Sequence, residues 1–262
     1  MDSRAIIPAC KIMDVGGDSV QKGSQSFKFD IPVYIEQTAS VVGEKESEGP
    51  LGRMFDVVIK DPMSGKDNWE QAESALQEAV VDKILMKTSY KKEQIRYILS
   101  GDLLGQLIAT SFGISKYEIP HFGIYGACST FGEALSLGAL IISAGAADRL
   151  ICMASSHFAS AEKQFRFPLE YGNQRPKAST WTVTGSGAAV ITNERQPVAI
   201  TGITTGKIID YGVKDSMNMG ACMAPAAADL IVANFKDFET DEKYYDLSLI
   251  HISEPTRLDV IS

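Results

Sequence analysis

A long uncharged helix is the feature that most limits how this chain can fold. Between Glu133 and Asp148 stand 14 residues without a charged side chain, ALSLGALIISAGAA. The stretch is too short to cross a bilayer, which takes about 20 mostly apolar residues. A helix from Phe131 to about Ala144 is apolar on every face, and such a helix is buried rather than laid on a surface. We therefore expect it between two layers of a larger fold.

A strand-to-helix elbow precedes this helix. Ile119 to Tyr125 is predicted as a strand, and Gly126-Ala127-Cys128 breaks it just before Thr130 and Glu133, which have the spacing of a capping box. Cys128 then lies ahead of a helix N-terminus, whose partial positive charge favours the thiolate and a role as nucleophile. The alternative is that the cysteine fills a tight elbow as a small apolar side chain.

The rest of the pattern alternates strands and helices, which is typical of the α/β class. A capping box at Asn68 and Gln71 begins an amphipathic helix that runs to about Lys87. Several strands are apolar without alternation, which indicates a sheet covered on both faces. The predicted strands are 31–42, 95–100, 149–154 and 180–192, with a helix over 103–112 and a polar loop over 44–52.

The strand-helix order restarts near Pro197. The sequence PVAI at Pro197 repeats the Pro-Val-x-Ile pattern of PVYI at Pro32, 165 positions earlier (197 − 32), and Pro225 is placed to open a helix that runs to Phe235. We predict two similar halves, of which the second is incomplete because the native chain continues further. The predicted domains are an irregular extension over 1–22, halves over 23–195 and 196–246, and a non-native tail over 247–262 that reads as translated sequencing adaptor.

Charge and cysteine spacing exclude several classes of function. The chain has 25 Lys and Arg against 33 Asp and Glu, a net charge of −8 that opposes binding to nucleic acid. Its 4 cysteines form no Cys-x-x-Cys pair and only 3 histidines accompany them, so neither a metal site nor a disulfide framework is predicted. The segment from Met1 to Met13 lacks the pattern of a secretory signal. We expect a cytoplasmic protein without a cofactor.

Several long segments resemble known families. GIYGACSTFGEALSLGALIISAGA and GSGAAVIT resemble the thiolase superfamily, and SSHFASAEKQFRFPLEYGNQRPKASTWTVTGSGAAV and DYGVKDSMNMGACMAPAAADLI resemble the stage V sporulation protein AD family. The resemblance covers residues 23–245 and implies a layered αβαβα fold of two similar halves.

The same resemblance implies a function. It implies a protein that binds dipicolinic acid, free or as a calcium chelate, and acts beside the integral membrane proteins of the spore dipicolinate transport complex. The implied location is peripheral, at the forespore or spore inner membrane. Because thiolase-like folds pair across a sheet edge, a homodimer is expected too.

Dipicolinate carries two carboxylates on a flat ring, so its pocket needs Arg side chains or helix N-termini together with an apolar slot. The residues predicted to line this pocket are Cys128, Ser129, His157, Arg166 and Asn218, with Arg175, Lys177 and Trp181 as further candidates. Each candidate has a plainer alternative. The charged residues can be solvated, Trp181 can belong to the core, Asn218 can cap a helix, and His157 can be a hydrogen-bonded loop residue.

The alternative function is that of an acyltransferase or condensing enzyme, in which Cys128 carries the acyl group. This chemistry needs a base for the thiol proton and donors for an oxyanion. His121 is predicted at the far end of its strand from Cys128 and is assigned a structural role. The thiolase-type partners implied by the resemblance lie beyond this chain. A binding protein is therefore favoured over an enzyme, and a scaffold used only for assembly is the third alternative.

Overall fold

The computed structural model describes residues 20–103, 105–162, 182–214 and 219–245. Within these ranges the chain forms one eight-stranded sheet in the order β1-β2-β7-β6-β4-β5, and β3 and β8 also pair with β2. The strands are β1 (Val20–Lys22), β2 (Ser26–Gly43), β3 (Val57–Ile59), β4 (Ile98–Asp102), β5 (His121–Gly123), β6 (Arg149–Ser156), β7 (Gly185–Thr192) and β8 (Val198–Thr204). The helices are α1 (Glu44–Ser47), α2 (Trp69–Thr88), α3 (Ile108–Ile114), α4 (Thr130–Ser143), α5 (Phe158–Glu162) and α6 (Met219–Phe238).

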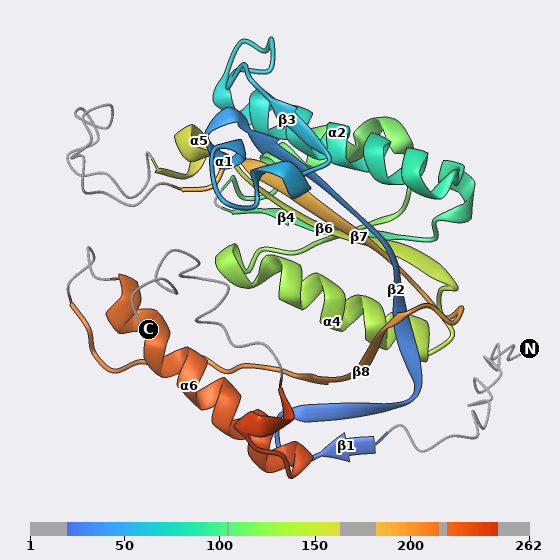
Figure 1. The fold of residues 1–262 in the computed structure, drawn as a ribbon, viewed down its shortest axis with the longest axis vertical. Helices are drawn as coiled ribbons and strands as arrows, with labels where there is room; N and C mark the ends of the chain where they lie inside the picture. Colours follow the sequence, from blue (N-terminus) through green and yellow to red (C-terminus); the bar gives the residue numbers. More distant parts are fainter. Residues whose placement is uncertain (1–19, 104, 163–181, 215–218, 246–262) are drawn as a thin grey trace, which may run out of the picture.

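The sheet is mixed and lies between helices. β4, β5 and β6 are parallel, whereas β7 runs antiparallel to both β6 and β2. α2 and α3 cover one face of the sheet and α4 covers the other, as Figure 1 shows. Because β4, β5 and β6 are parallel, their carboxyl ends and the loops that follow them lie at one edge of the sheet. That edge carries the candidate site.

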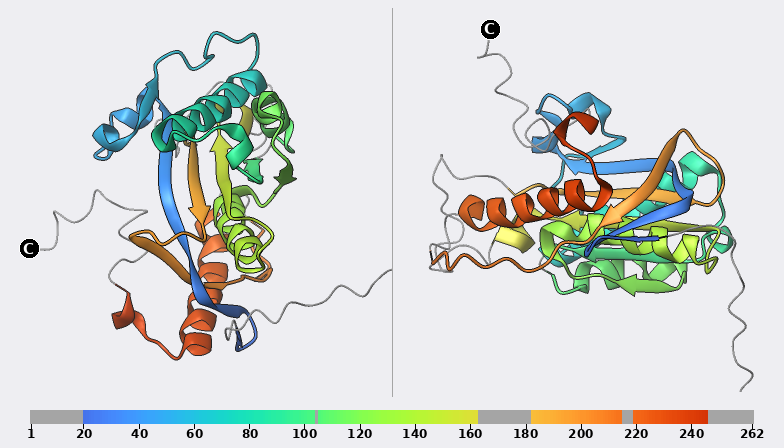
Figure 2. Two further views of the ribbon diagram at one scale, coloured as in Figure 1. Left: turned by 90° about the vertical axis from the view of Figure 1, so that its right-hand side faces the viewer. Right: turned by 90° about the horizontal axis from the view of Figure 1, so that it is seen from below.

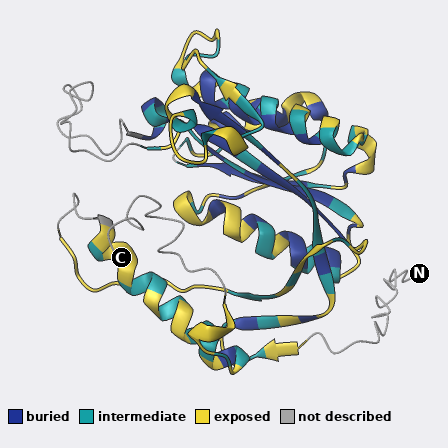
Figure 3. Ribbon diagram, in the orientation of Figure 1, coloured by how far each residue is buried: buried dark blue, intermediate teal, exposed yellow. Residues whose placement is uncertain are grey.

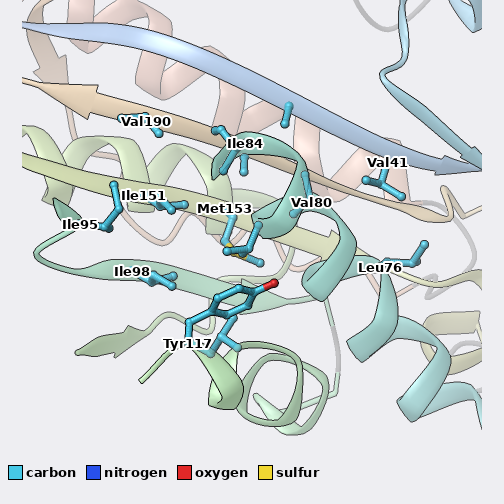
Figure 4. Close-up of a cluster of buried hydrophobic side chains, with 14 residues drawn as sticks. Val41, Leu76, Val80, Ile84, Ile95, Ile98, Tyr117, Ile151, Met153 and Val190 are labelled. Carbon is cyan, nitrogen blue, oxygen red and sulfur yellow. The ribbon is translucent and has the colours of Figure 1, made fainter. Parts of the chain in front are cut away.

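Each face of the sheet has its own apolar core. Under α2, the buried side chains of Leu76, Val80 and Ile84 pack with Ile151 and Met153 of β6 (Figure 4). Under α4, a second cluster is formed by Leu99, Ala134, Ala139, Leu150, Cys152 and Ile191. Neighbouring residues of β6 and β7 are therefore buried on opposite faces, which confirms the prediction drawn from their lack of polar alternation.

The predicted start and end of α2 are confirmed. Asn68 is the N-cap residue, and its side chain accepts a hydrogen bond of 2.9 Å from the backbone N–H of Gln71. The helix ends at Thr88, where Ser89 takes a left-handed conformation with a φ of 59°. These residues define the two ends of α2, which packs against β2, β6 and β7.

The prediction that the uncharged helix is buried on every face is wrong for the part of the chain described. α4 buries Ala134, Ala139 and Ile142 against the sheet, but Phe131 and Leu137 on its other face are exposed (Figure 3). Its composition predicted burial on both sides, whereas the described residues cover only the side that faces the sheet.

Three element predictions also need correction. The helix expected over 103–112 begins only at Ile108, because the Asp102 carboxylate accepts hydrogen bonds from the backbone N–H groups of Leu107 and Thr110 at 3.2 Å each. This holds 105–107 outside the helix. Pro225 lies inside α6 rather than opening it. The loop predicted over 44–52 contains the short helix α1.

The last described elements, β8 and α6, attach to the N-terminal part of β2. β8 pairs antiparallel with β2, and α6 packs against both strands (Figure 2). The Asp237 carboxylate near the end of α6 accepts hydrogen bonds from Gln25 N at 3.1 Å and from the Ser26 hydroxyl at 2.9 Å. Among the described residues, no helix has both the length and the apolarity that crossing a bilayer requires.

Candidate functional site

The predicted elbow at Cys128 is present. The chain leaves β5 at Gly123, makes a 3-10 turn over Ala127–Ser129 and enters α4 at Thr130. Ala127 has a φ of +49°, a left-handed conformation that costs a residue with a Cβ about 1–2 kcal/mol. Cys128 follows it directly and is exposed. The strained turn thus presents the thiol to solvent at the N-terminus of a 14-residue helix.

Hydrogen bonds hold the elbow in a way that the capping-box prediction did not anticipate. Ser129 is the N-cap residue of α4, and its side chain does not cap the helix. Instead its hydroxyl donates to Gly126 O at 2.8 Å and contacts the Glu133 carboxylate. Thr130 Oγ1 accepts a hydrogen bond of 3.3 Å from Gly126 N. The Ser129 side chain therefore leaves α4 uncapped, whereas the N–H of Thr130, the first residue of the helix, donates to Ala127 O within the 3-10 turn.

His157 lies on the opposite face of the sheet from α4. It continues the alternation of Ile151, Met153 and Ser155 toward α2 and is 1% exposed. Its Nε2 is 2.9 Å from Pro62 O, and Ala159 N donates to Nδ1 at 3.2 Å, which assigns a neutral ring protonated at Nε2. Burial lowers the pKa of this imidazole.

The structure therefore does not bring His157 and Cys128 together. The imidazole is stacked on Phe158 and tilted against Trp69, whose rings also contact each other, and both its nitrogens are hydrogen bonded within the fold. This geometry corresponds to the plainer alternative of a hydrogen-bonded histidine, although it is buried more completely than expected.

His121 has the structural surroundings that its position predicted. It begins β5, and its Nε2 lies 3.0 Å from the buried Ser100 hydroxyl of β4. Burial lowers the pKa of this histidine as well. Neither of the two described histidines is placed to accept a proton from Cys128.

Five of the predicted site residues lie outside the part of the chain that the structure describes: Arg166, Arg175, Lys177, Trp181 and Asn218. Over the described ranges, no group of three or more His, Cys, Asp or Glu side chains is arranged to hold a metal ion. A groove of about 620 Å³ lies by Arg96 and Arg149, which flank the amino ends of β4 and β6, and a cavity of about 210 Å³ lies beside α1. Cys128 lines neither the groove nor the cavity.

Sequence reasoning missed a buried polar cluster at the carboxyl edge of the sheet. Glu73 and Gln77 of α2 are 2% and 0% exposed. The Glu73 carboxylate accepts hydrogen bonds from the Ser155 and Ser160 hydroxyls at 2.7 and 2.6 Å. A signal was present, because Glu73 and Gln77 continue the i, i+4 spacing toward Val80 and Ile84 along the buried side of α2.

Comparison with solved structures defines the class of protein. The chain matches 3-oxoacyl-(acyl carrier protein) synthase III from Xanthomonas oryzae with a TM-score of 0.55 and 15% identity, covering 84% of this chain and 77% of that one. It matches cerulenin-bound OleA from Xanthomonas campestris with a TM-score of 0.54 and 14% identity, covering 84% and 74%. At these identities the likeness concerns the fold alone. The class is a thiolase-like mixed α/β protein.

Sequence comparison then gives the family. The family profile of stage V sporulation protein AD matches residues 23–251. The stage V sporulation protein AD of Bacillus subtilis strain 168 is 40% identical over 227 residues, which are 87% of this chain and 67% of that protein. The chain belongs to the stage V sporulation protein AD family.

Proposed function

We propose that this protein binds dipicolinic acid during spore formation and supports its uptake into the developing spore together with integral membrane partners. The observation that carries the proposal is the 40% identity to a stage V sporulation protein over 227 residues. The implied place of action is the cytoplasmic side of the forespore or spore inner membrane. Calcium accompanies the ligand if the chelate, rather than the free acid, is carried.

The proposed ligand site is centred on Cys128 and Ser129. A carboxylate placed there meets the N-terminal end of α4, where the partial positive charge of the helix favours an anion. Arg166 supplies a second, charge-assisted contact in this proposal, and Asn218 lines the opposite wall. The exposed Glu133 carboxylate beside Ser129 opposes the ligand, so the site must offset one repulsive charge.

We also infer an architecture of two similar halves, 23–195 and 196–246, with a layered αβαβα arrangement. α2 and α6 support it, because each has 20 residues and each follows a strand of the repeated Pro-Val-x-Ile pattern. A homodimer is part of the proposal. β5 ends the sheet, and Phe122 on it is 48% exposed, so a second copy can extend the sheet there.

Isothermal titration calorimetry tests the binding proposal. We expect dipicolinic acid to give saturable heat with the folded chain, and picolinic acid, which has the same ring with one carboxylate, to bind at least tenfold more weakly. Parallel titrations with and without calcium identify the species bound. Equal affinity for both acids, or no heat with dipicolinic acid, would count against the proposal.

The strained elbow favours acyl transfer by Cys128 as a second candidate function. A left-handed residue immediately before an exposed cysteine, at a helix N-terminus, is an arrangement suited to a nucleophile. The base would have to come from outside the described residues. Incubation with acyl thioesters of several chain lengths, followed by intact mass measurement, tests this candidate. An adduct that disappears in Cys128→Ala supports it, and the absence of any adduct rejects it.

A further inference from the structure

We propose that Glu73 is a proton-responsive positioning residue, which holds α5 against the sheet while it carries a proton and allows α5 to open when it ionises. This inference does not depend on the ligand of the protein. It rests on the buried hydrogen-bonded cluster that links α2 to the ends of β4 and β6 and to α5.

The carboxyl group of Glu73 joins two separate elements. One oxygen accepts from the Ser155 hydroxyl of β6 at 2.7 Å, and the other accepts from the Ser160 hydroxyl of α5 at 2.6 Å. The backbone N–H of Phe158, at the start of α5, also donates to Thr184 Oγ1 at 3.0 Å. A change at Glu73 therefore alters one of the hydrogen bonds that hold α5 to the rest of the fold.

A chain of side chains connects Glu73 to a second buried carboxylate. Gln77 Nε2 donates to the Ser155 and Thr110 hydroxyls at 2.6 and 2.8 Å, and Thr110 Oγ1 donates to Asp102 at 3.2 Å. Asp102 is 0% exposed. Two acidic groups thus share one buried network, and ionising both places like charges in a region of low dielectric.

The charged groups that act on Glu73 are both acidic, Asp102 on β4 and Glu70 on α2. β6 and α5 contribute the hydroxyls of Ser155 and Ser160, and His157 at the turn between them has both nitrogens engaged. Burial is the largest cause and, together with these carboxylates, outweighs the hydrogen bonds from Ser160 and Ser155, which lower the pKa. As a result the pKa of Glu73 is raised from 4.5 to about 7. Glu73 therefore exchanges its proton near neutral pH.

The closed arrangement satisfies the protonated form. The Ser160 hydroxyl lies 3.2 Å from His157 O as well as 2.6 Å from Glu73. When Glu73 is protonated, it can donate to Ser160 while Ser160 donates to His157 O. When Glu73 is ionised, the closed arrangement keeps its negative charge away from water, which is unfavourable. Moving α5 aside hydrates that charge.

Linkage gives the size of the effect. If opening α5 returns the pKa of Glu73 from about 7 to 4.5, the opening equilibrium rises on the order of twentyfold between about pH 5.5 and 7.5. The closed form of α5 becomes less populated as pH rises, because it binds the proton on Glu73 more tightly than the open form does. Above the pKa of the closed form the effect levels off.

Hydrogen exchange at the backbone N–H of Ala161, which donates to His157 O at 2.9 Å, tests the proposal. After correction for the intrinsic pH dependence of exchange, protection in the wild type should fall on the order of twentyfold over that interval. Glu73→Gln, which cannot ionise, should keep its protection constant. Glu78→Gln is the matched control, because Glu78 lies on the same helix in a partly exposed ion pair with Lys116 and should leave the wild-type pH dependence intact.

Ser160→Ala gives an independent readout if Glu73→Gln does not fold. It keeps the buried carboxyl group but removes its partner on α5, so Ala161 should exchange faster at every pH. Protection that is independent of pH in the wild type would overturn the proposal, as would a pH dependence that persists in Glu73→Gln.

Discussion

Tyr34 of β2 faces Ala199 of β8 in an antiparallel ladder, and the same two residues are equivalent in the repeat, since 199 − 34 gives the 165-residue offset between Pro32 and Pro197. On either side, Val33 faces Ile200 and Ile35 faces Val198. A repeated strand whose central residue pairs with its own counterpart has a local two-fold axis at that pair. The pairing supports the proposal that 196–246 begins a second half related to the first.

This relationship predicts what covers the exposed apolar faces. Phe131 and Leu137 of α4 and Val232 of α6 are exposed, and the chain spans 67% of the Bacillus subtilis relative. Adding the part of that relative that the match does not cover should bury these faces and lower binding of the dye ANS. It should also raise the melting temperature, since apolar burial stabilises by about 25 cal/mol per Å². An unchanged melting temperature together with unchanged dye binding would contradict the two-half architecture.

The strain at the elbow predicts a stabilising substitution. Ala127→Gly removes the Cβ from a residue with a φ of +49° and should raise the free energy of unfolding by about 0.5–1 kcal/mol after the greater flexibility of glycine is subtracted. Urea denaturation measures this change in the free energy of unfolding. The control is Ala144→Gly at a right-handed position with a φ of −76°, which should lower stability by about 0.5 kcal/mol. Equal effects of the two substitutions would show that the elbow is not strained.

Glu73 predicts how global stability depends on pH. Its folded pKa, about 7, lies above the value of 4.5 expected on unfolding, so the folded state binds more protons in this interval. The stability that the bound proton contributes is fully present below the unfolded pKa and is lost as pH rises through the folded pKa. The free energy of unfolding falls by up to about 3 kcal/mol as a result. Urea midpoints from pH 4.5 to 8 should show a slope that Glu73→Gln reduces and Glu78→Gln keeps. A slope that is the same in all three proteins contradicts the assignment.

The free edge of the sheet predicts an assembly. If a second copy pairs along β5, Phe122→Lys should convert a dimer into a monomer, because a charge at an edge strand opposes pairing. Light scattering during size-exclusion chromatography measures the mass. Met86→Lys, at an exposed position of α2, is the control and should remain dimeric. A monomeric wild type would rule out this assembly.

Local signals predicted the elements whose determinants are local. The cap at Asn68, the end of α2 and the elbow before α4 each depend on a few neighbouring residues. The position of His157 could not be predicted in the same way, since its partner Pro62 lies 95 residues earlier in the chain. Periodicity indicated that α4 is suited to burial, but not which of its faces the described residues cover.

The buried cluster around Glu73 shows a second limit of the sequence. Its members come from α2, β4, α3, β6 and α5, and none of these segments contains a recognisable motif for it. A polar residue on a mostly apolar stripe was the available signal. Without the tertiary contacts, the same pattern also describes a solvated helix face.

The central claim, that dipicolinic acid binds at the N-terminus of α4, is tested most directly by calorimetric titration of two site variants. Glu133→Gln removes the exposed carboxylate beside Ser129 and should tighten binding about fivefold, whereas Ser129→Glu adds a negative charge and should weaken it by at least that factor. The wild type should lie between them, and all three proteins should show the same far-UV circular dichroism spectrum. Affinity that is unchanged by both substitutions, or dipicolinic acid that fails to bind the folded wild type, would contradict the account.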